Sequence, residues 1–413
     1  MAGKDRISEL PLGILDNILG FLPIQDAART AILSSFWKDI WLSLTKLNFG
    51  YGFINYIRLK YAEGGKLQLL IFDVIYKILM RHSGPIHKIV LDFSEEEFEF
   101  NFNEEFDLED IPNLSNNLKQ WFLLLTQNGV EEIDISASVE AQCRVPNCIF
   151  SCPTLKRLKL STVPLELINC VLPNVTSLCL DCVDFEPTNR RDYVYHLPML
   201  EDLSFVYCYG IFDFNIVAPK LGSLKIDLPE CFCYDFKEFG VLPASLDLRS
   251  ISSLDLGCET CCFETIIGKL TRVGHAPALN IELLKLAIYP PYNINNFAFI
   301  HLLRACPKLC ELDICHLEFL KLNPEDFVLM EELSSVARTL KMLRTLKFSH
   351  FNGWRSEMQS IKVFLAYFPG IEKVVIVRRQ IRYDNDKEFK IMQELLRFPR
   401  ASTKAEIFYI KES

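Results

Sequence analysis

Apolar residues follow two different periods along the chain. From Asp5 to Leu44 they recur at the three- and four-residue spacing of a helix, whereas from Ile86 onward they recur mainly as short alternating runs. The first period predicts short amphipathic helices, and the second predicts strands with one buried face. The sequence therefore predicts an α/β chain whose first segment is helical and whose remainder contains a succession of short strands.

The helical segment breaks into three short helices. Pro11 lies where a first-turn proline is tolerated, Pro23 ends the first helix, and Asp26 is expected to be the N-cap of a helix over residues 27–32. The apolar stripe of the first helix consists of Ile14, Leu15, Ile18, Leu19 and Leu22, and that of the third consists of Phe36, Trp37, Ile40, Trp41 and Leu44. A unit this small usually needs a metal, disulfides or a partner. Because the segment contains no cysteine, its apolar surplus predicts a partner surface.

The alternating runs belong to a sequence repeat. In six segments a proline is followed at fixed spacing by three apolar residues; they begin at Pro153, Pro173, Pro198, Pro219, Pro307 and Pro369. The segments "SSLDL" from Ser252, "ELLKL" from Glu282 and "LRTLKF" from Leu343 match the core of this pattern, and residues 86–93 and 130–135 resemble it more loosely. The last two apolar positions indicate a short strand, and the proline starts the preceding bend. Because one copy cannot bury its own apolar edge, the copies must stack.

This pattern is that of an irregular leucine-rich repeat, and it predicts a solenoid with parallel strands on its concave face. A globular α/β domain whose strands are similar by coincidence is the alternative. In a solenoid, the residue between the paired apolar positions faces solvent. That row consists of Lys159, Cys179, Ser204, Lys225, Asp255, Lys285, Asp313 and Lys347.

The mixed charge of this row favours a protein partner over nucleic acid, and a merely solvated face is the alternative for any one residue. Since the flanking leucines supply the stability, we expect these side chains to tolerate substitution at little cost to folding.

Composition narrows the classes of function. The 413-residue chain carries a net charge of −9, which argues against a nucleic-acid partner, because a surface that follows phosphates needs an excess of Lys and Arg. The charged first residues show no secretory signal, and the longest apolar stretch is interrupted by Asp73 and Lys77. We therefore expect a soluble intracellular protein without a membrane partner. Residues 95–110 carry many acids and no base, and they are expected to form an exposed loop.

The 15 cysteines are irregularly spaced, which argues against a disulfide framework and favours small buried side chains. Cys179 with Cys182 and Cys258 with Cys261 each form a CxxC, and two such pairs can signal zinc. However, the two pairs lie far apart in the sequence, and the first coincides with a predicted strand. We expect reduced cysteines, no metal and no cofactor.

No common catalytic or nucleotide-binding motif occurs in the sequence. The patterns GxGxxG, GxxxxGK[ST], GxSxG and HExxH are all absent. His301 and His316 flank a repeat strand, but no clear nucleophile accompanies them. We therefore expect no catalytic residues.

The helical segment resembles an F-box, particularly of the plant type. The matching positions are Leu10, Pro11, Ile14, Leu15, Ile18, Leu19, Leu22, Pro23, Asp26, Arg29, Leu33, Ser34, Trp37 and Trp41. Two positions depart from the family pattern: Gly13 replaces the usual acidic residue, and Phe36 replaces the usual basic residue before the first tryptophan. Neither departure removes an apolar anchor.

The tail resembles the FBD region that follows leucine-rich repeats in many plant F-box proteins. It carries "FSHFNGWRSEMQSIKVFLAYFPGIEKVVIV" and "FKIMQELLRFPRASTKAEIFY". The resemblance implies a helix over about 356–367, a strand over 372–377, a helix over 386–397 and a last strand. It also implies an F-box at 1–50, leucine-rich repeats at 51–340 and an α/β FBD cap at 341–413.

In this family the three helices bind a Skp-class adaptor, which joins them to a cullin-based ubiquitin ligase, and the repeats hold a protein substrate. The resemblance thus implies a non-catalytic substrate receptor in the nucleus or cytoplasm. Its candidate adaptor-binding residues are Leu10, Pro11, Ile14, Leu15, Ile18, Leu19, Leu22, Pro23, Asp26, Arg29 and Trp37. Its candidate substrate-binding residues are Lys225, Asp255, Lys285, Asp313 and Lys347, with the basic stretch from Val377 to Tyr383 as the rival surface. The alternative function is a leucine-rich-repeat scaffold that binds a ligand without any ligase.

Overall fold

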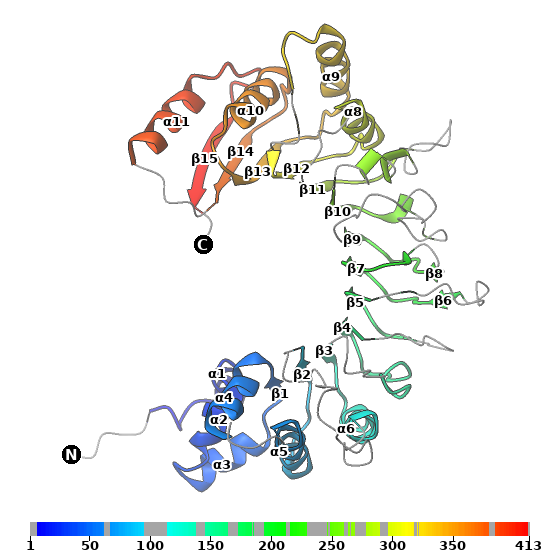
Figure 1. Ribbon diagram of the computed structural model, residues 1–413, viewed down its shortest axis with the longest axis vertical. Helices are drawn as coiled ribbons and strands as arrows, with labels where there is room; N and C mark the ends of the chain where they lie inside the picture. Colours follow the sequence, from blue (N-terminus) through cyan, green and yellow to red (C-terminus); the bar gives the residue numbers. More distant parts are fainter. Residues whose placement is uncertain are drawn as a thin grey trace, which may run out of the picture. The chain divides into compact units, whose positions relative to one another are not determined.

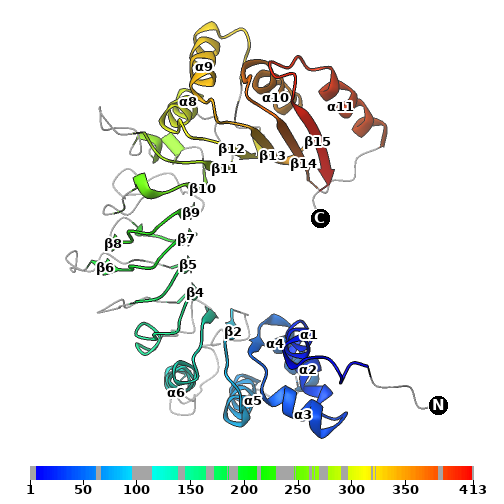
Figure 2. The same cartoon turned by 180° about the vertical axis from the view of Figure 1, so that it is seen from behind.

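The computed structural model contains two compact units, which Figures 1 and 2 show from opposite sides. The first comprises Met1–Asp184 with Tyr195–Leu200, and the second comprises Phe185–Val194 with Glu201–Ser413. The structure describes residues 6–61, 67–94, 114–137, 145–163, 172–183, 185, 194–211, 215–228, 246, 248–259, 263–264, 266–268, 278–289, 296–317, 320, 322–379 and 385–411. The acidic stretch 95–110, Cys261 and residues 380–383 of the basic stretch lie outside these ranges.

The first unit begins with the three predicted helices. They are α1 (Leu12–Gly20), α2 (Ile24–Thr30) and α3 (Ser35–Leu42). Pro11 and Pro23 stand immediately before α1 and α2, and the Ser34 side chain accepts a hydrogen bond from the Trp37 amide at the start of α3. The prediction that Asp26 is an N-cap is wrong, because Pro23 already starts the helix and Asp26 lies in its first turn. A carboxylate there still interacts favourably with the positive end of the helix dipole.

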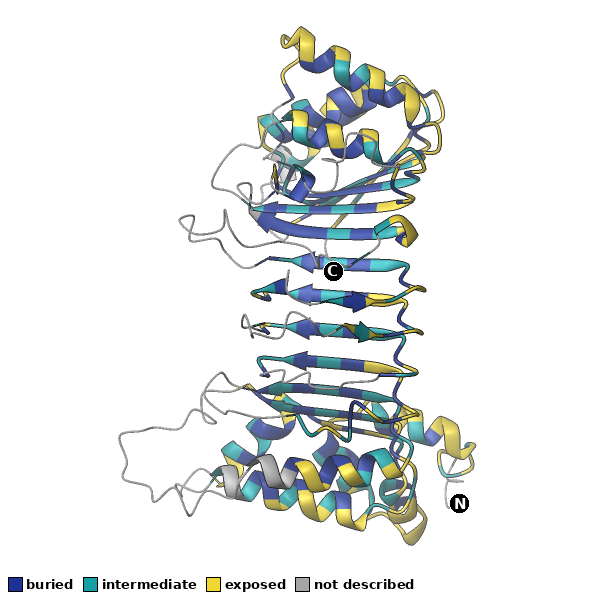
Figure 3. Cartoon of the chain, turned by 90° about the vertical axis from the view of Figure 1, so that its right-hand side faces the viewer, coloured by how far each residue is buried: buried dark blue, intermediate teal, exposed yellow. Residues whose placement is uncertain are grey.

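A parallel sheet with covering helices completes the first unit. Its strands are β1 (Lys46–Phe49), β2 (Lys88–Phe93), β3 (Glu132–Ala137), β4 (Arg157–Ser161) and β5 (Ser177–Asp181), with the short β6 (Tyr195–His196), and its further helices are α4 (Tyr51–Tyr61), α5 (Leu67–Arg81) and α6 (Leu114–Gln127). The main strands pair in the order β1-β2-β3-β4-β5. One face of each strand is buried, as the alternating period predicts (Figure 3). Trp121 and Phe122 of α6 are fully buried.

The second unit continues the same construction. Its strands are β7 (Asp202–Val206), β8 (Ile216–Val217), β9 (Ser223–Asp227), β10 (Ser253–Glu259), β11 (Leu283–Tyr289), β12 (Glu311–Cys315), β13 (Thr345–Phe351), β14 (Lys373–Arg378) and β15 (Glu406–Lys411). Its helices are the 3-10 turn η4 (Leu248–Ser250), α8 (Asn296–Ala305), α9 (Phe327–Thr339), α10 (Arg355–Tyr367) and α11 (Asn385–Arg397). The parallel order is β7-β9-β10-β11-β12-β13-β14-β15. The alternation α10, β14, α11 and β15 follows the order that the FBD resemblance implies (Figure 1).

Each proline-started bend stacks on the bend before it. The apolar residue two positions after the proline is fully or almost fully buried in every copy: these residues are Leu155, Val175, Leu200, Leu221, Leu309 and Ile371. The bends also exchange backbone hydrogen bonds, for example from the Cys310 amide to the Glu282 carbonyl and from the Glu372 amide to the Arg344 carbonyl. Because both the apolar edge and the backbone groups are satisfied by the next copy, the repeat is stable only as a stack.

Several strands end in a residue with a left-handed backbone. The φ angle lies between 50° and 57° at the described residues Thr162, Cys182, Tyr207, His316 and His350. A left-handed conformation is uncommon for residues other than glycine. Within each unit the amides of these residues bond to a neighbouring strand, as from Thr162 to the Asp181 carbonyl and from Tyr207 to the Asp227 carbonyl. The turn therefore extends the sheet's hydrogen bonding by one residue.

Side-chain hydrogen bonds tie the N-terminal helices to the start of the first sheet and to the end of α5. Asp16 of α1 accepts hydrogen bonds from the Thr45 amide at 2.9 Å and from the Thr45 hydroxyl at 2.6 Å. The Nε2 of His82 lies 2.8 Å from the Leu44 carbonyl oxygen, and the Gly84 amide donates to its Nδ1 at 3.3 Å. Nδ1 also lies 3.0 Å from the Gly84 carbonyl oxygen, so both ring nitrogens face a backbone oxygen. Burial of His82 lowers its pKa below the usual 6.5.

We predict that the first unit loses stability as the pH falls from about 7.5 to about 5.5. In this window His82 takes up a proton in the unfolded chain, whereas burial disfavours the charged form in the folded chain. The unfolded state then binds more protons, so the free energy of unfolding decreases as the pH is lowered. His82→Gln should flatten the dependence of the melting temperature on pH, and the same change at the exposed His301 should leave it unchanged. Equal pH slopes for His82→Gln and wild type would contradict this account.

Candidate interaction surfaces

The three N-terminal helices expose large apolar side chains. Ile14, Ile18 and Phe21 recur along one side of α1, and Ile32 and Leu33 occupy the turn between α2 and α3. Phe21 is 89% exposed and Ile32 is 84% exposed. We call the exposed set the apolar helix surface; its members are Leu12, Ile14, Ile18, Phe21, Leu22, Ile32, Leu33 and Phe36. Exposed apolar groups so concentrated in a short segment are typical of a protein-binding site.

The interior of the same helices holds the remaining predicted residues. Leu15, Leu19 and Trp37 are buried between the helices, so they support the surface from behind. The indole Nε1 of Trp37 donates a hydrogen bond to the Ser8 hydroxyl at 3.1 Å, which holds the residues before α1 against α3. Leu10 is half-buried beside this contact.

The candidate adaptor-binding residues thus fall into three groups. Pro11, Ile14, Ile18, Leu22, Pro23 and Arg29 are exposed, Leu10 and Asp26 are half-buried, and Leu15, Leu19 and Trp37 are buried. The sequence did not single out the exposed Leu12, Phe21 and Ile32 as candidates. Leu12 and Ile32 lie outside the stripes, and Phe21 lies at the end of α1. Ile14 and Ile18 were assigned to a single stripe of the first helix. A helical projection that allows two apolar sides, one inward and one outward, would have placed these two residues together on the outward side.

The strand registers place the predicted charged residues in rows. In the second unit Lys225, Asp255, Lys285, Asp313 and Lys347 lie side by side on β9 to β13, and we call them the charged row. The Lys285 ammonium lies 3.1 Å from the Asp255 carboxylate, and that of Lys347 lies 2.7 Å from Asp313. In the first unit Lys159 similarly pairs with Asp134 at 3.6 Å. The charged row therefore compensates most of its own charge.

One expectation about this row is wrong. Asp313 was expected to tolerate substitution, but its side chain is only 5% exposed and accepts hydrogen bonds from Lys347 and from the Ser349 hydroxyl at 2.9 Å. Substitution of a buried carboxylate leaves its hydrogen-bond donors without an acceptor, and this destabilises the folded state. By contrast, Lys225 makes no ion pair with any described residue, and it lies half-exposed at the start of the row.

A stacked pair of histidine rings, with a tilted tyrosine ring beside it, borders the charged row. His316 and His350 lie parallel with ring centroids 4.8 Å apart, and Tyr289 lies 5.5 Å from His316. They follow the strands that carry Lys285, Asp313 and Lys347. Burial raises the pKa of Tyr289 to about 12, so its phenol is neutral in the folded chain. His301 is not part of this cluster and lies exposed on α8.

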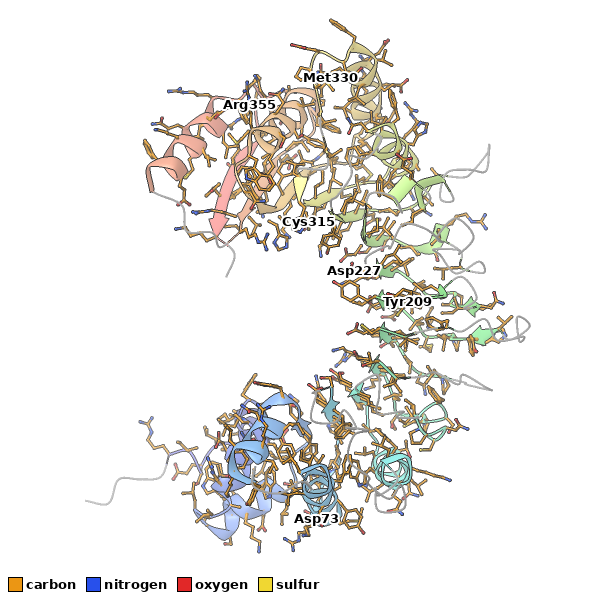
Figure 4. All side chains as sticks on the ribbon, in the orientation of Figure 1. Asp73, Tyr209, Asp227, Cys315, Met330 and Arg355 are labelled. Atoms are coloured by element: carbon orange, nitrogen blue, oxygen red, sulfur yellow. The ribbon has the colours of Figure 1, made fainter. Side chains whose placement is uncertain are left out.

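The described cysteines differ in burial: Cys152, Cys208, Cys258, Cys306 and Cys315 are buried, Cys148, Cys179 and Cys310 are half-buried, and Cys182 is exposed. Burial raises the pKa of Cys182 and of Cys315 to about 11 and that of Cys306 to about 12, which disfavours the thiolate that a metal requires. Cys258 is fully buried in β10, and Cys315 lies in register with Asp227 through two intervening strands (both residues are labelled in Figure 4). Among the described residues, no group of three or more His, Cys, Asp or Glu side chains could hold a metal ion.

Comparisons with known proteins place these surfaces in a family. The F-box domain family matches residues 7–49, and the family "FBD-associated F-box protein At5g56370, LRR repeats" matches residues 118–283. The Arabidopsis thaliana F-box/FBD/LRR-repeat protein At1g13570 is 26% identical over 445 aligned positions that cover 99% of both chains. The Arabidopsis F-box protein At4g09920 is 30% identical over 238 positions, covering 55% of this chain and 67% of that protein.

The chain belongs to the plant F-box/LRR-repeat/FBD protein family. The Arabidopsis FBD-associated F-box protein At5g38590 is a further relative, 29% identical over 56% of this chain and 52% of its own length. The match to the F-box domain covers the apolar helix surface and ends with β1, the first strand of the sheet. Among the described residues of this F-box/LRR-repeat protein, no helix is both long and apolar enough to span a membrane.

We predict that Asp313→Ala destabilises the second unit by about 2 kcal/mol or more, because it leaves Lys347 and Ser349 without their buried acceptor. Lys225→Ala, on the same face, should change the free energy of unfolding by less than about 0.5 kcal/mol. Urea denaturation of the two variants checks this difference. Equal stabilities would show that the ion pair in the row contributes nothing to the fold.

Proposed function

We propose that this F-box/LRR-repeat protein is the substrate-recognition subunit of an SCF-type ubiquitin ligase. It binds a Skp-class adaptor, and through it a cullin, by the apolar helix surface, and it holds a protein substrate on its repeats. It performs no chemistry itself and acts in the nucleus or cytoplasm, where the ligase operates. We retain the domain limits 1–50, 51–340 and 341–413 for the F-box, repeats and FBD region as part of the same proposal.

The apolar helix surface is the observation that supports this proposal most. Fully burying one large apolar side chain releases about 1.5–3 kcal/mol, so covering four of the most exposed ones would supply about 6–12 kcal/mol before the costs of association. Phe21, Ile32, Leu33 and Leu12 are the four most exposed members. A gain of this size suits a stable complex with a protein partner.

The predicted contact residues then divide their roles. The exposed residues Ile14, Ile18 and Leu22 touch the adaptor, whereas Leu15, Leu19 and Trp37 hold α1 and α3 in the arrangement that presents them. Gly13 has open space around the position of a Cβ, and Phe36 is exposed, so neither departure from the family pattern disturbs the packing of the helices.

The connection to the sheet gives the tether a defined geometry. The F-box segment ends in β1, which pairs with β2 from Lys46 to Phe49, and the Asp16–Thr45 hydrogen bonds close the corner. Within the first unit the adaptor surface and the first repeats are therefore parts of one packed body. A rigid tether raises the local concentration of a bound substrate at the ligase more effectively than a flexible one.

Substrate capture is assigned to the charged row, with Lys225 as its most available charge. Lys285 and Lys347 already neutralise Asp255 and Asp313. These four residues would therefore offer a substrate polar contacts and not a strong electrostatic attraction. In the rival basic stretch, Arg378 is buried in an ion pair with Glu388 at 2.6 Å, and Arg379 is exposed. Arg378 thus fastens α11 to β14, which leaves Arg379 as the described residue of that stretch available to a partner.

We predict that Phe21→Glu and Ile14→Glu each weaken binding of a purified Skp-class adaptor by at least about a hundredfold, since a carboxylate would be buried against an apolar partner. Both side chains are exposed, so the melting temperature should not change. The control is Phe327→Glu, which alters a phenylalanine that is 84% exposed on α9 of the second unit. Isothermal titration calorimetry measures the affinities. If the wild-type chain does not bind the adaptor, the scaffold alternative is favoured.

We predict that Lys225→Glu reduces the ubiquitination of the proteins whose modification also disappears with Phe21→Glu. The double change Asp255→Lys with Lys285→Asp keeps the ion pair within the row while exchanging the two charges. It therefore separates recognition of these charges from their role in the fold. Quantitative proteomics of ubiquitin remnants compares these variants with Arg379→Glu. An effect of Arg379→Glu alone would assign capture to the tail.

A further inference from the structure

A basic and aromatic cluster lies where the F-box segment meets the helix that follows it. Arg29 of α2 pairs with Asp26 at 2.6 Å and donates a second hydrogen bond to the Tyr56 hydroxyl of α4 at 3.3 Å. Lys60, one turn further along α4, donates to the same hydroxyl at 3.2 Å. Arg29 and Lys60 also lie over the Tyr56 ring, at 5.2 Å and 5.6 Å from its centroid. Tyr56 and Lys60 are beyond residue 49, where the family match to the F-box ends.

The cluster lacks acceptors rather than donors. The Tyr56 oxygen accepts hydrogen bonds from Arg29 and Lys60, and its own O–H donates to no described residue. Lys60 has three N–H donors and no carboxylate partner among the described residues. Helix α4 carries Arg58 and Lys60 and no acidic residue, although the chain as a whole has a net charge of −9.

The two hydrogen bonds also tune the ionisation of the cluster. The bond from Lys60 is the main cause that lowers the pKa of Tyr56, and the bond to Tyr56 raises the pKa of Lys60. Lys60 therefore stays charged at neutral pH. A carboxylate that approaches this cluster would find an ammonium group and a phenol O–H as hydrogen-bond donors.

The cluster is continuous with the apolar helix surface. The Ile32 amide donates to the Arg29 carbonyl at 3.1 Å, so the most exposed apolar turn begins beside Arg29. Helix α4 packs against α2 in the first unit (Figure 1). A partner that covers Ile32 and Leu33 would reach the cluster without further movement of the chain.

We propose that Arg29 of the F-box segment, together with Tyr56 and Lys60 beyond it, forms a second adaptor contact that receives an acidic side chain of the Skp-class adaptor. This inference rests on the proposed function, because it assumes that the adaptor covers the apolar helix surface. The carboxylate accepts the Tyr56 O–H and one N–H of Lys60 while Asp26 keeps Arg29 in place. The contact would extend adaptor recognition to α4, which begins directly after the F-box segment.

The test uses the full chain, a purified Skp-class adaptor and calorimetric titrations at low and at high salt. Lys60→Glu should raise the dissociation constant about tenfold at low salt and weaken its dependence on salt. Tyr56→Phe should raise it about threefold, with no change of net charge. The matched control is Lys308→Glu, which makes the same charge change at an exposed lysine of the second unit and should alter the affinity by less than about twofold.

The outcomes separate the two proposals. If Phe21→Glu does not weaken adaptor binding, the proposed function fails, and this contact fails with it. If Phe21→Glu abolishes binding but Lys60→Glu and Tyr56→Phe behave like Lys308→Glu, the acidic contact alone is wrong. A loss of substrate ubiquitination with an unchanged adaptor affinity would also overturn it, because the cluster would then serve the substrate.

Discussion

The three N-terminal helices carry more large apolar side chains than they can bury against one another. Leu15, Leu19 and Trp37 fill the space between the helices, and Phe21, Ile32 and their neighbours are left in solvent. Exposed apolar area is unfavourable in water, and burying it against a partner stabilises a complex. The segment is therefore suited to association with another protein. The contacts of Asp16 with Thr45 and of His82 with Leu44 then fix the same helices to the first strands of the sheet.

The repeats obey a related constraint. No copy buries its proline-started bend alone, and each relies on the next for both apolar contacts and backbone hydrogen bonds. Inward leucines therefore provide the stability, and the opposite face of the strands is available for polar residues. In the second unit some of these polar residues bond to one another and are not available to a partner, since Asp313 is buried between Lys347 and Ser349. Lys225, by contrast, carries a charge that the described residues do not neutralise.

Local spacing predicts most of the elements but not their orientation. The repeat rule predicts the strands of the long sheet from β4 to β14, but not the short β6 and β8, and the helical stripes predict α1 to α3, because both depend on periods within a few residues. The division between Leu15 inside and Ile14 outside depends on where α3 lies, which is a tertiary property. Likewise, the row of charges follows from the repeat, whereas the pairing of Lys347 with a buried Asp313 depends on register and depth. The misassigned cap at Asp26 arose because Pro23 and Asp26 both signal a helix start, and the proline comes first.

Amide hydrogen exchange of the full chain, with and without a saturating Skp-class adaptor, tests the central claim most directly. If the apolar helix surface is the adaptor site, the amides that gain protection are those of residues 12–22 and 29–36. Residues 223–227 and 253–259 on the charged row should exchange at the same rate in both samples. Protection of the strands instead of the helices, or of neither, would contradict the assignment of these helices as the docking site.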